Sequence, residues 1–295
     1  MPLPRRVLPL LLLVTLLTTG FAAPPCPDPA AVARAKELAT PGMSGANDWG
    51  CRPSRRHPRP VVLVHGTFAN GTVWADAVPR FTRAGYCVFV LDYGKTGAPG
   101  MYGMGPIADS AKELAAFVDG VRAATGAGRV DIVGHSQGGM MPRQYMRFEG
   151  GARRVHTLVG LAPSNRGTTL DLRDALADER PELAAAEQTL FAFAPCQACT
   201  EQLAGSDFLT KLNAGGPTLP GVTYAVAATK YDFVVTPYKS QFLPGSSPRV
   251  HNQLVQDACL FDFALHSTIQ NDPVALRFAL NALDPAHAEP LSCSA

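Results

Sequence analysis

The sequence has no excess of charge of either sign, no glycine period and no low-complexity tract. Its 26 Lys and Arg residues stand against 24 Asp and Glu residues in a chain of 295. No basic stripe indicates nucleic-acid binding, and no acidic block indicates a solvating tail. With 46% apolar and 17% charged residues, the composition excludes a disordered tail protein and a collagen. The length suffices for one large domain or two small ones with a well-buried core.

The hydrophobic run near the N-terminus is too short to span a membrane. Val7–Thr19 has about 13 residues, whereas a spanning helix needs roughly 20. Arg5 and Arg6 precede the run, and small residues ending at Ala22 and Ala23 follow it. This pattern is typical of a secretory signal peptide. We therefore predict that residues 1–23 are removed, that residues 24–295 form the mature domain with 24 residues of each charge, and that the protein is secreted and extracellular.

Seven cysteines fit an oxidising compartment, where exported thiols tend to pair. The buried-strand setting of Cys87 makes it our choice for the unpaired thiol. Proximity and position along the chain favour three bridges, namely Cys26–Cys51, Cys196–Cys199 and Cys259–Cys293. A redox pair or half of a metal site is an alternative interpretation of Cys196-x-x-Cys199, but without matching Cys or His spacing we favour a structural bridge.

Short apolar runs rich in β-branched residues alternate with helical patterns. The expected strands are 61–64, 86–91, 130–133, 157–161, 223–228 and, less clearly, 250–255. Helical patterns cover 107–125 and 136–149, and Asp28-Pro29, Ser206-Asp207 and Asp272-Pro273 are typical helix starts. Apolar strands separated by helices indicate an α/β fold with a mostly parallel central sheet and helices on both faces.

The interval 165–220 interrupts this alternation with several short amphipathic pieces. Fifty-six residues between two strands are too many for a plain connection and predict a helical cap over the functional edge of the sheet; an ordinary helical layer is the alternative. The apolar residues of the interval are Leu170, Leu172, Leu176, Leu190, Phe191, Phe193, Leu203, Phe208 and Leu209. Together with Phe233, Val234 and Val235, these residues are expected to line an acyl channel or an interfacial surface. The alternative is that they pack in the ordinary hydrophobic core.

One motif carries the chemistry. Gly134-His-Ser136-Gln-Gly138 directly follows an apolar strand and precedes a helix. A nucleophilic serine needs this setting, because it must sit on a tight strained turn whose flanking positions admit no side chain. Chance produces such a match roughly once in ten chains of this composition, so the strand and helix around it matter. We identify Ser136 as the candidate nucleophile.

The expected strand 61–64 leads into His65-Gly66-Thr67, at the usual position of the other half of an oxyanion hole. Backbone N–H groups of Thr67 and of Gln137, the residue after the nucleophile, are positioned to bind a developing alkoxide. The Thr67 hydroxyl offers a further hydrogen bond. Removing one such donor typically costs about 3 kcal/mol, or roughly a hundredfold in rate.

The acid and the base follow later strands. Asp232 comes just past the end of strand 223–228, where active-site groups of open sheets collect. Asp257 and Asp262 compete for this role but lie on the connection that carries the histidine. Of seven histidines, only His266 is both late in the chain and on a loop at the sheet edge. The order Ser136, Asp232, His266 is that of the α/β-hydrolases.

These segments resemble secreted bacterial lipases and esterases of the class 2 group. The resemblance rests on Val-His65-Gly66-Thr, Gly-His-Ser136-Gln-Gly-Gly, Tyr-Asp232-Phe-Val-Val-Thr-Pro and Leu-His266, and it extends from about Pro60 to Asp284. The Ser-Gln-Gly-Gly step is also similar to the elbow of fungal B-type lipases. The resemblance implies an α/β-hydrolase fold and hydrolysis of carboxylic esters, foremost triacylglycerols, without a cofactor.

Several alternatives stay open at this point. Short-chain carboxylesterase and polyester hydrolase share the same machinery, and an acyltransferase differs only in the acceptor. A binding protein on a hydrolase scaffold is disfavoured, because such proteins usually lack a member of the set. We expect an ester or lipid substrate, which a lipase would bind at a lipid–water interface. We expect no binding of nucleic acid and no stable insertion into a membrane, and we expect the protein to be a monomer. No cluster has convincing metal spacing, although structural calcium stays open.

Overall fold

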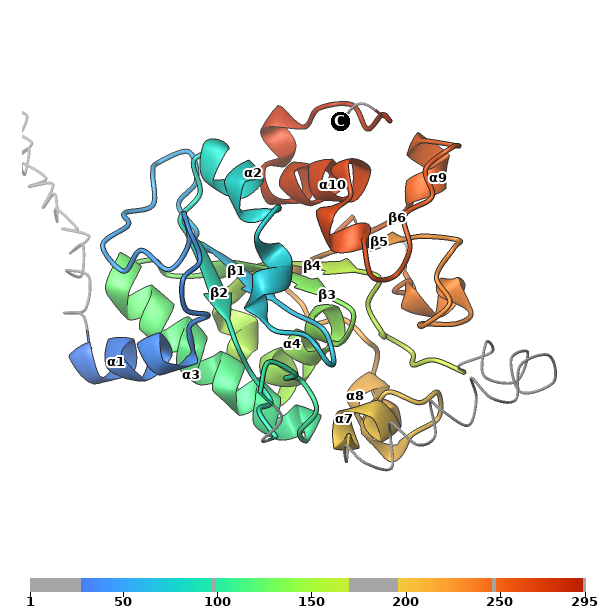
Figure 1. The fold of residues 1–295 in the computed structure, drawn as a ribbon, viewed down its shortest axis with the longest axis horizontal. Coiled ribbons are helices and arrows are strands. Elements are labelled where there is room, and N and C mark those ends of the chain that lie inside the picture. The colour runs from blue at the N-terminus through green and yellow to red at the C-terminus, as the bar shows by residue number, and fades with distance from the viewer. Residues whose placement is uncertain (1–27, 97–98, 170–195, 246–247, 294–295) are drawn as a thin grey trace, which may run out of the picture.

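The computed structural model describes residues 28–96, 99–169, 196–245 and 248–293. Within these residues a six-stranded sheet has the order β2-β1-β3-β4-β5-β6, with all neighbouring strands parallel (Figure 1). The strands are β1 (Val61–Val64), β2 (Val88–Leu91), β3 (Val130–His135), β4 (Val155–Leu161), β5 (Thr223–Ala228) and β6 (Val250–Leu254). The expected α/β class and parallel sheet are confirmed.

The central strands are buried on both faces, which explains why they are continuous apolar runs rather than alternating ones. Along β1, Val62 and Val64 point into one hydrophobic cluster, while Val61 and Leu63 point into another. All four are fully buried. Only the edge strand β6, whose sequence has less apolar character, carries exposed side chains. This explains why β6 was the weakest of the six expected strands.

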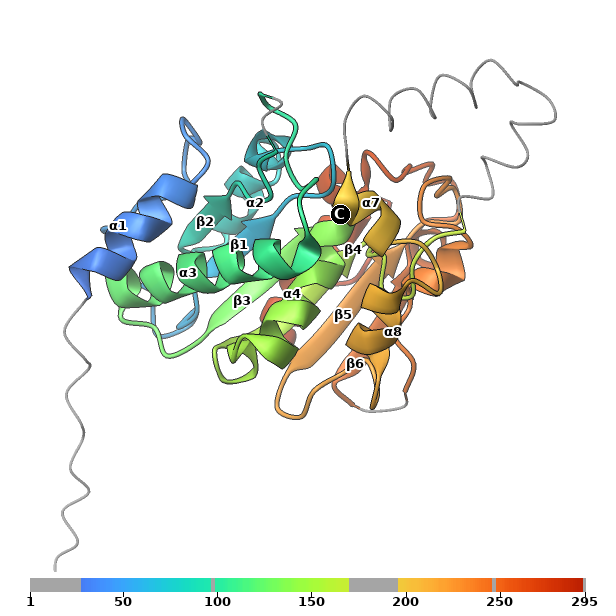
Figure 2. The same cartoon turned by 90° about the horizontal axis from the view of Figure 1, so that it is seen from below.

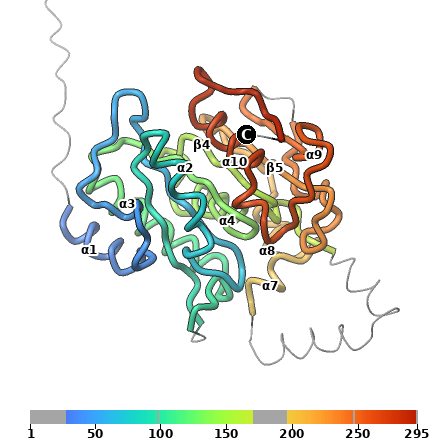
Figure 3. The backbone as a smooth tube through the Cα atoms, turned by 45° about the horizontal axis from the view of Figure 1, so that its top comes forward, coloured from blue at the N-terminus to red at the C-terminus, as the bar shows by residue number. Residues whose placement is uncertain are grey.

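Helices cover both faces of this sheet (Figure 1), and Figure 2 shows one of these faces from below. The helices are α1 (Pro29–Leu38), α2 (Val78–Arg83), α3 (Ile107–Thr125), α4 (Gln137–Phe148), α7 (Gln197–Glu201), α8 (Asp207–Asn213), α9 (Val255–Ala258) and α10 (Pro273–Leu283). Residues of α3, α4, α7 and α8 enter one cluster, and residues of α2, α9 and α10 enter the other. Figure 3 follows the chain from blue α1, which packs along α3, to red α10.

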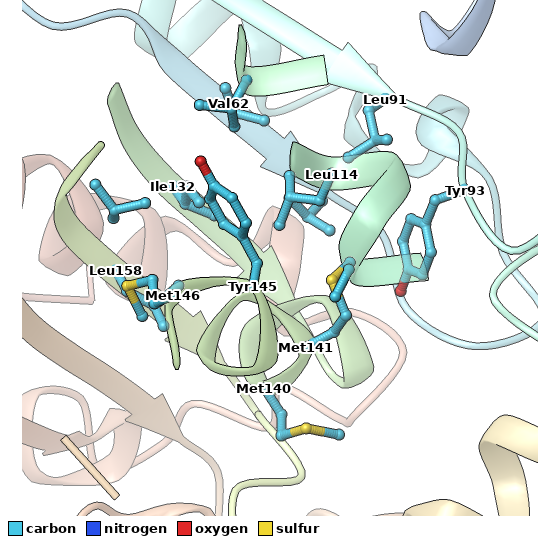
Figure 4. Packing of buried hydrophobic residues seen from close by; sticks show 14 of the residues in the cluster. Val62, Leu91, Tyr93, Leu114, Ile132, Met140, Met141, Tyr145, Met146 and Leu158 are labelled. Carbon is cyan, nitrogen blue, oxygen red and sulfur yellow. The ribbon is translucent and has the colours of Figure 1, made fainter. Parts of the chain in front are cut away.

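The packing around α4 sets the position of the turn that precedes it. Met140, Met141 and Tyr145 are fully buried and belong to the same hydrophobic cluster as Val62 and Ile132, and Figure 4 shows Tyr145 turned toward these strand residues. Flexible methionine side chains fill irregular gaps well. The first turns of α4 are therefore held against β1 and β3, and the loop between β3 and α4 has little freedom to move.

The three helix starts identified in the sequence are confirmed. Asp28 caps α1, its Oδ1 accepting hydrogen bonds from the N–H groups of Ala30 (3.0 Å) and Ala31 (3.2 Å). Asp272 caps α10, accepting from the N–H of Ala275 at 2.8 Å. The Ser206 hydroxyl accepts from the N–H of Leu209 at the start of α8. In each case a side-chain oxygen satisfies a backbone donor that the helix leaves free.

Two of the three expected disulfides are present and one is wrong. Cys196–Cys199 and Cys259–Cys293 are formed as predicted. Cys87, however, is no free thiol, because it is bonded to Cys51. The loop before β1 runs back along β2, with the Asn47 N–H bonded to the Val88 carbonyl, and this brings Cys51 beside Cys87. The expected partner of Cys51, Cys26, lies outside the described residues.

The interval 165–220 is described only in part. Its C-terminal portion contains α7 and α8, and Leu209 packs into the core while Leu203 is 37% exposed. Leu170, Leu172, Leu176, Leu190, Phe191 and Phe193 lie outside the described residues, so the expected cap stays a prediction. Across the part of the chain that the structure describes, no helix has the length and apolar character needed to cross a membrane.

Candidate active site

Ser136 occupies a strained turn between β3 and α4. Its φ of 55° and ψ of −124° lie in a region that non-glycine residues rarely adopt. The turn is tight: a Cβ at Gly134 would overlap the carbonyl of Gly138, and a Cβ at Gly138 would overlap the carbonyls of Val64 and His65. The two glycines of the motif are therefore required by close packing, and the turn projects Ser136 beyond the sheet edge.

Three side chains far apart in the sequence meet at this edge. Nε2 of His266 lies 3.0 Å from Oγ of Ser136, and Nδ1 of His266 lies 2.7 Å from Oδ2 of Asp232. Ser136 is 6%, Asp232 4% and His266 9% exposed. A carboxylate bonded to Nδ1 keeps the proton there and leaves Nε2 able to accept one from the hydroxyl. The structure thus brings together the three residues selected from the sequence.

Asp232 is held in a fixed orientation by three further donors. Its Oδ1 accepts hydrogen bonds from the N–H groups of Val234 and Val235, each at 2.8 Å. Its Oδ2 accepts one from Nε2 of Gln241, also at 2.8 Å. The competing carboxylates are elsewhere. Oδ1 of Asp262 accepts from the N–H of Ala264, and Asp257 is exposed on α9.

The two proposed oxyanion-hole residues flank the serine. Gln137 is the first residue of α4, and a helix leaves the N–H groups of its first turn without intrahelical partners. The Gln137 side chain is occupied elsewhere: its amide oxygen accepts from the Tyr93 hydroxyl (2.7 Å), and its amide nitrogen donates to the Gly103 carbonyl (3.1 Å). Thr67 follows β1 and lines the same pocket as Ser136.

The serine and the histidine open into a pocket of about 350 Å³. Its apolar lining includes Phe68, Ala69, Val73, Val234 and Val235. Of the apolar residues expected beside the acid, Val234 and Val235 line this pocket, whereas Phe233 is 54% exposed. An apolar pocket with a few polar groups at its base suits an acyl chain attached to a polar reacting centre.

The model of the family described as "Lipase (class 2)" matches residues 58–279. The chain belongs to the class 2 lipase family. It is therefore an α/β-hydrolase of the lipase and esterase type, as the sequence resemblance implied.

Solved structures of lipases share the fold of this family member. Lipase B of Aspergillus fumigatus is 18% identical with a TM-score of 0.62, over 87% of this chain and 57% of its own. The mature form of lipase BlEst2 of Bacillus licheniformis is 17% identical with a TM-score of 0.57, over 79% of this chain and 94% of its own. The chain thus spans little more than half of the Aspergillus protein, and identities this low show the fold alone.

Gln202 is a pocket residue of this lipase-family chain that the sequence analysis missed. Its amide nitrogen donates to Oγ1 of Thr67 (2.9 Å) and to the Ala198 carbonyl (3.1 Å), and its amide oxygen accepts from the Ser164 hydroxyl (2.7 Å). Because Thr67 Oγ1 accepts this hydrogen bond, its own proton is left to be donated. Gln202 lies in no motif, and its contact with Thr67 joins residues 135 positions apart in the chain.

Two buried histidines next to the site are held neutral. Burial lowers the pKa of His65 to about 4 and that of His135 to about 3. His65 stacks on Tyr93, with ring centroids 4.3 Å apart, and accepts a hydrogen bond from the Tyr93 N–H at Nε2. Each imidazole is therefore uncharged at neutral pH and does not compete with His266 for the Asp232 carboxylate.

These two histidines should make the fold sensitive to mild acid. In the unfolded chain both titrate near 6.5, whereas the folded chain resists their protonation until about pH 4 and pH 3. Below pH 6.5 the unfolded state thus binds more protons, so the free energy of unfolding should fall as the pH falls. We expect a loss of about 2 kcal/mol per histidine between pH 7 and pH 5.

Urea unfolding at pH 7, 6 and 5 would measure this loss. Burial raises the pKa of Asp272 to about 6, so its protonation favours the folded state over the same range and offsets part of the effect. An unfolding free energy that stays constant or rises from pH 7 to pH 5 would contradict the prediction.

Among the described residues, no group of three or more His, Cys, Asp or Glu side chains is arranged to hold a metal ion.

Proposed function

We propose that the chain hydrolyses carboxylic esters through an acyl-enzyme on Ser136. The observation that supports this most is the hydrogen-bonded series from Oγ of Ser136 through His266 to Asp232, at the base of an apolar pocket. His266 takes the hydroxyl proton as Oγ attacks the ester carbonyl, and Asp232 stabilises the resulting imidazolium. The short distances from Nε2 of His266 to Oγ of Ser136 and from Nδ1 of His266 to Oδ2 of Asp232 support both roles.

The negative oxygen of the tetrahedral intermediate is stabilised by N–H groups of Thr67 and Gln137. When the intermediate collapses, His266 gives its proton to the departing alcohol. Water then attacks the acyl-enzyme along the same route, with His266 again as the base, and releases the acid. No cofactor takes part.

We propose further that the substrate is a water-insoluble ester, foremost a triacylglycerol. Exposed apolar side chains form what we call the mouth patch: Phe233, Val234, Leu260, Phe261, Phe263 and Leu265. These residues lie next to Asp232 or just before His266 in the chain, and Val234 also lines the pocket. Exposed apolar clusters of this kind mark surfaces that bind other apolar surfaces.

The mouth patch is held by its surroundings. The Cys259–Cys293 bridge fixes the start of the segment before His266. Two of its carbonyl oxygens accept hydrogen bonds: that of Asp262 from Nε2 of Gln256 (3.0 Å) and that of Ala264 from Oγ1 of Thr229 (2.7 Å). Rings of Tyr231 and Phe263 stack across the two segments at 5.4 Å. With the backbone bonded inward, the apolar side chains face solvent.

The test is a comparison of emulsified and soluble esters. Phe261→Ser combined with Phe263→Ser should lower the rate on emulsified long-chain triacylglycerol about tenfold or more. The reason is that the variant loses the free energy that the wild type gains when these two exposed rings move from water into the lipid surface. The rate on a soluble short-chain ester should stay within about twofold. Phe148→Ser, which removes an exposed ring at the end of α4, is the matched control and should leave both rates unchanged.

Equal losses on both substrates would contradict a surface-binding role for the mouth patch. Good activity on soluble esters with little on the emulsion would make the protein an esterase instead, and no ester hydrolysis at all would overturn the proposed function.

We also propose that the protein is secreted as a monomer after removal of residues 1–23. The bonded cysteine pairs support an oxidising destination.

A further inference from the structure

His135, the residue before the candidate nucleophile, contacts the backbone of the candidate base. Its Nε2 lies 2.7 Å from the carbonyl oxygen of His266, 131 residues further along the chain. The two imidazole centroids are 4.9 Å apart and the rings are inclined by 49°. His135 itself is 7% exposed and ends β3, a strand buried along its whole length.

The direction of this hydrogen bond follows from chemistry. A carbonyl oxygen only accepts, so Nε2 of His135 must carry the proton. Because burial lowers the pKa of His135 to about 3, the ring is neutral at working pH and has this one N–H donor. A neutral ring also adds no positive charge beside His266 when that residue becomes an imidazolium during the reaction.

The contact gives His266 a third point of attachment. Its Nδ1 is held by Asp232 and its Nε2 faces Ser136, while His135 holds its carbonyl oxygen. The other two attachments involve only the imidazole. His135 therefore joins the backbone of the loop that carries the base to the strand that carries the nucleophile, one residue from Ser136.

We propose that His135 is a positioning residue that sets the separation between Nε2 of His266 and Oγ of Ser136. This role rests on the proposed acyl-enzyme chemistry. A displacement of about 1 Å in such a geometry costs up to a hundredfold in rate. Without the His135 donor, the position of His266 depends on its imidazole contacts and on a loop whose nearest preceding anchor is the hydrogen bond from Thr229 to the Ala264 carbonyl.

A matched pair of variants isolates the N–H donor. Gln and Met are both unbranched and of similar volume, and Nε2 of Gln is separated from Cα by as many bonds as Nε2 of His. His135→Met should lower kcat on a soluble short-chain ester about 10- to 100-fold with KM within about twofold. His135→Gln should restore kcat to within about threefold of the wild type.

A spectroscopic measurement separates positioning from general destabilisation. The proton shared by His266 Nδ1 and Asp232 should give a low-field proton NMR signal in the wild type and in His135→Gln. In His135→Met the signal should broaden or shift, with a cooperative thermal transition retained. If His135→Met keeps wild-type kcat and the same signal, or if folded His135→Gln is as slow as His135→Met, the proposal is wrong. If His135→Met does not fold, His135→Leu takes its place under the same criteria.

The outcome is distinguishable from failure of the proposed function. If a Ser136→Ala protein hydrolyses esters normally in the same assay, the acyl-enzyme is wrong. If that protein is inactive while His135→Met is fully active, only the positioning role fails.

Discussion

Replacing Ser136 with alanine should lower kcat on any accepted ester by about 10⁴-fold or more. The hydroxyl oxygen is the only atom that the change removes, and it lies 3.0 Å from Nε2 of His266. Loss of the nucleophile leaves only the catalysis that binding and the oxyanion donors supply. Because no buried methylene is lost and alanine keeps the Cβ, the melting temperature should stay close to that of the wild type.

The measurement combines steady-state rates with labelling by a fluorophosphonate. Mass spectrometry should find the adduct on the peptide containing Ser136 in the wild type and on no peptide in the variant. Ser267→Ala is the matched control, because Ser267 lines the same pocket but is exposed, and its activity and labelling should be unchanged. Retention of full esterase activity by Ser136→Ala would rule out the assignment.

Replacing Asp232 with asparagine should cost about 10⁴-fold in kcat, although the side chain keeps its shape. The structure determines which way the amide turns. Oδ1 accepts from two backbone N–H groups, of Val234 and Val235, so the amide oxygen must stay there and the NH₂ group must face His266. That NH₂ donates to Nδ1, which places the imidazole proton on Nε2, and Nε2 then cannot accept the proton of Ser136.

The fold should accommodate this substitution. Gln241 donates to the carboxylate in the wild type, and in the described part of the chain its buried amide oxygen has no hydrogen-bond partner. Rotation of its amide supplies an acceptor for the new NH₂. Asp257→Asn, the same chemical change on an exposed helix residue, is the control and should retain full activity. If Asp257→Asn were inactive and Asp232→Asn active, the acid would have been assigned to the wrong connection.

Local structure could be predicted from the sequence more fully than contacts between distant segments. Strands such as 61–64 and 223–228 were predicted with their observed ends, because a strand buried on both faces needs an unbroken apolar run. Helix starts at Asp28 and Asp272 were predictable because a cap is a contact between residues two or three apart. Local contacts of this kind leave a local signature.

Other contacts, between distant segments, left no such signature. The Cys51–Cys87 bond depends on how the loop before β1 runs along β2, and the composition of that loop does not indicate its path. Gln202 follows α7 and reaches Thr67, which lies 135 positions earlier in the chain. For the same reason, His135 was recognised as part of the serine motif but not as a contact of His266.

The amino-acid order alone determined the set of elements and the choice of the three candidate reacting groups. A nucleophile on a glycine-flanked turn, and an acid and a base each following a strand, are patterns of neighbouring residues, and parallel strands bring their carboxyl ends to one edge. The tertiary structure decided the orientation of Asp232, the donor to Thr67 and the partner of the His266 carbonyl. These depend on loops whose conformations are set by packing against residues tens to hundreds of positions away, so the positioning of the chemistry was visible only in the folded chain.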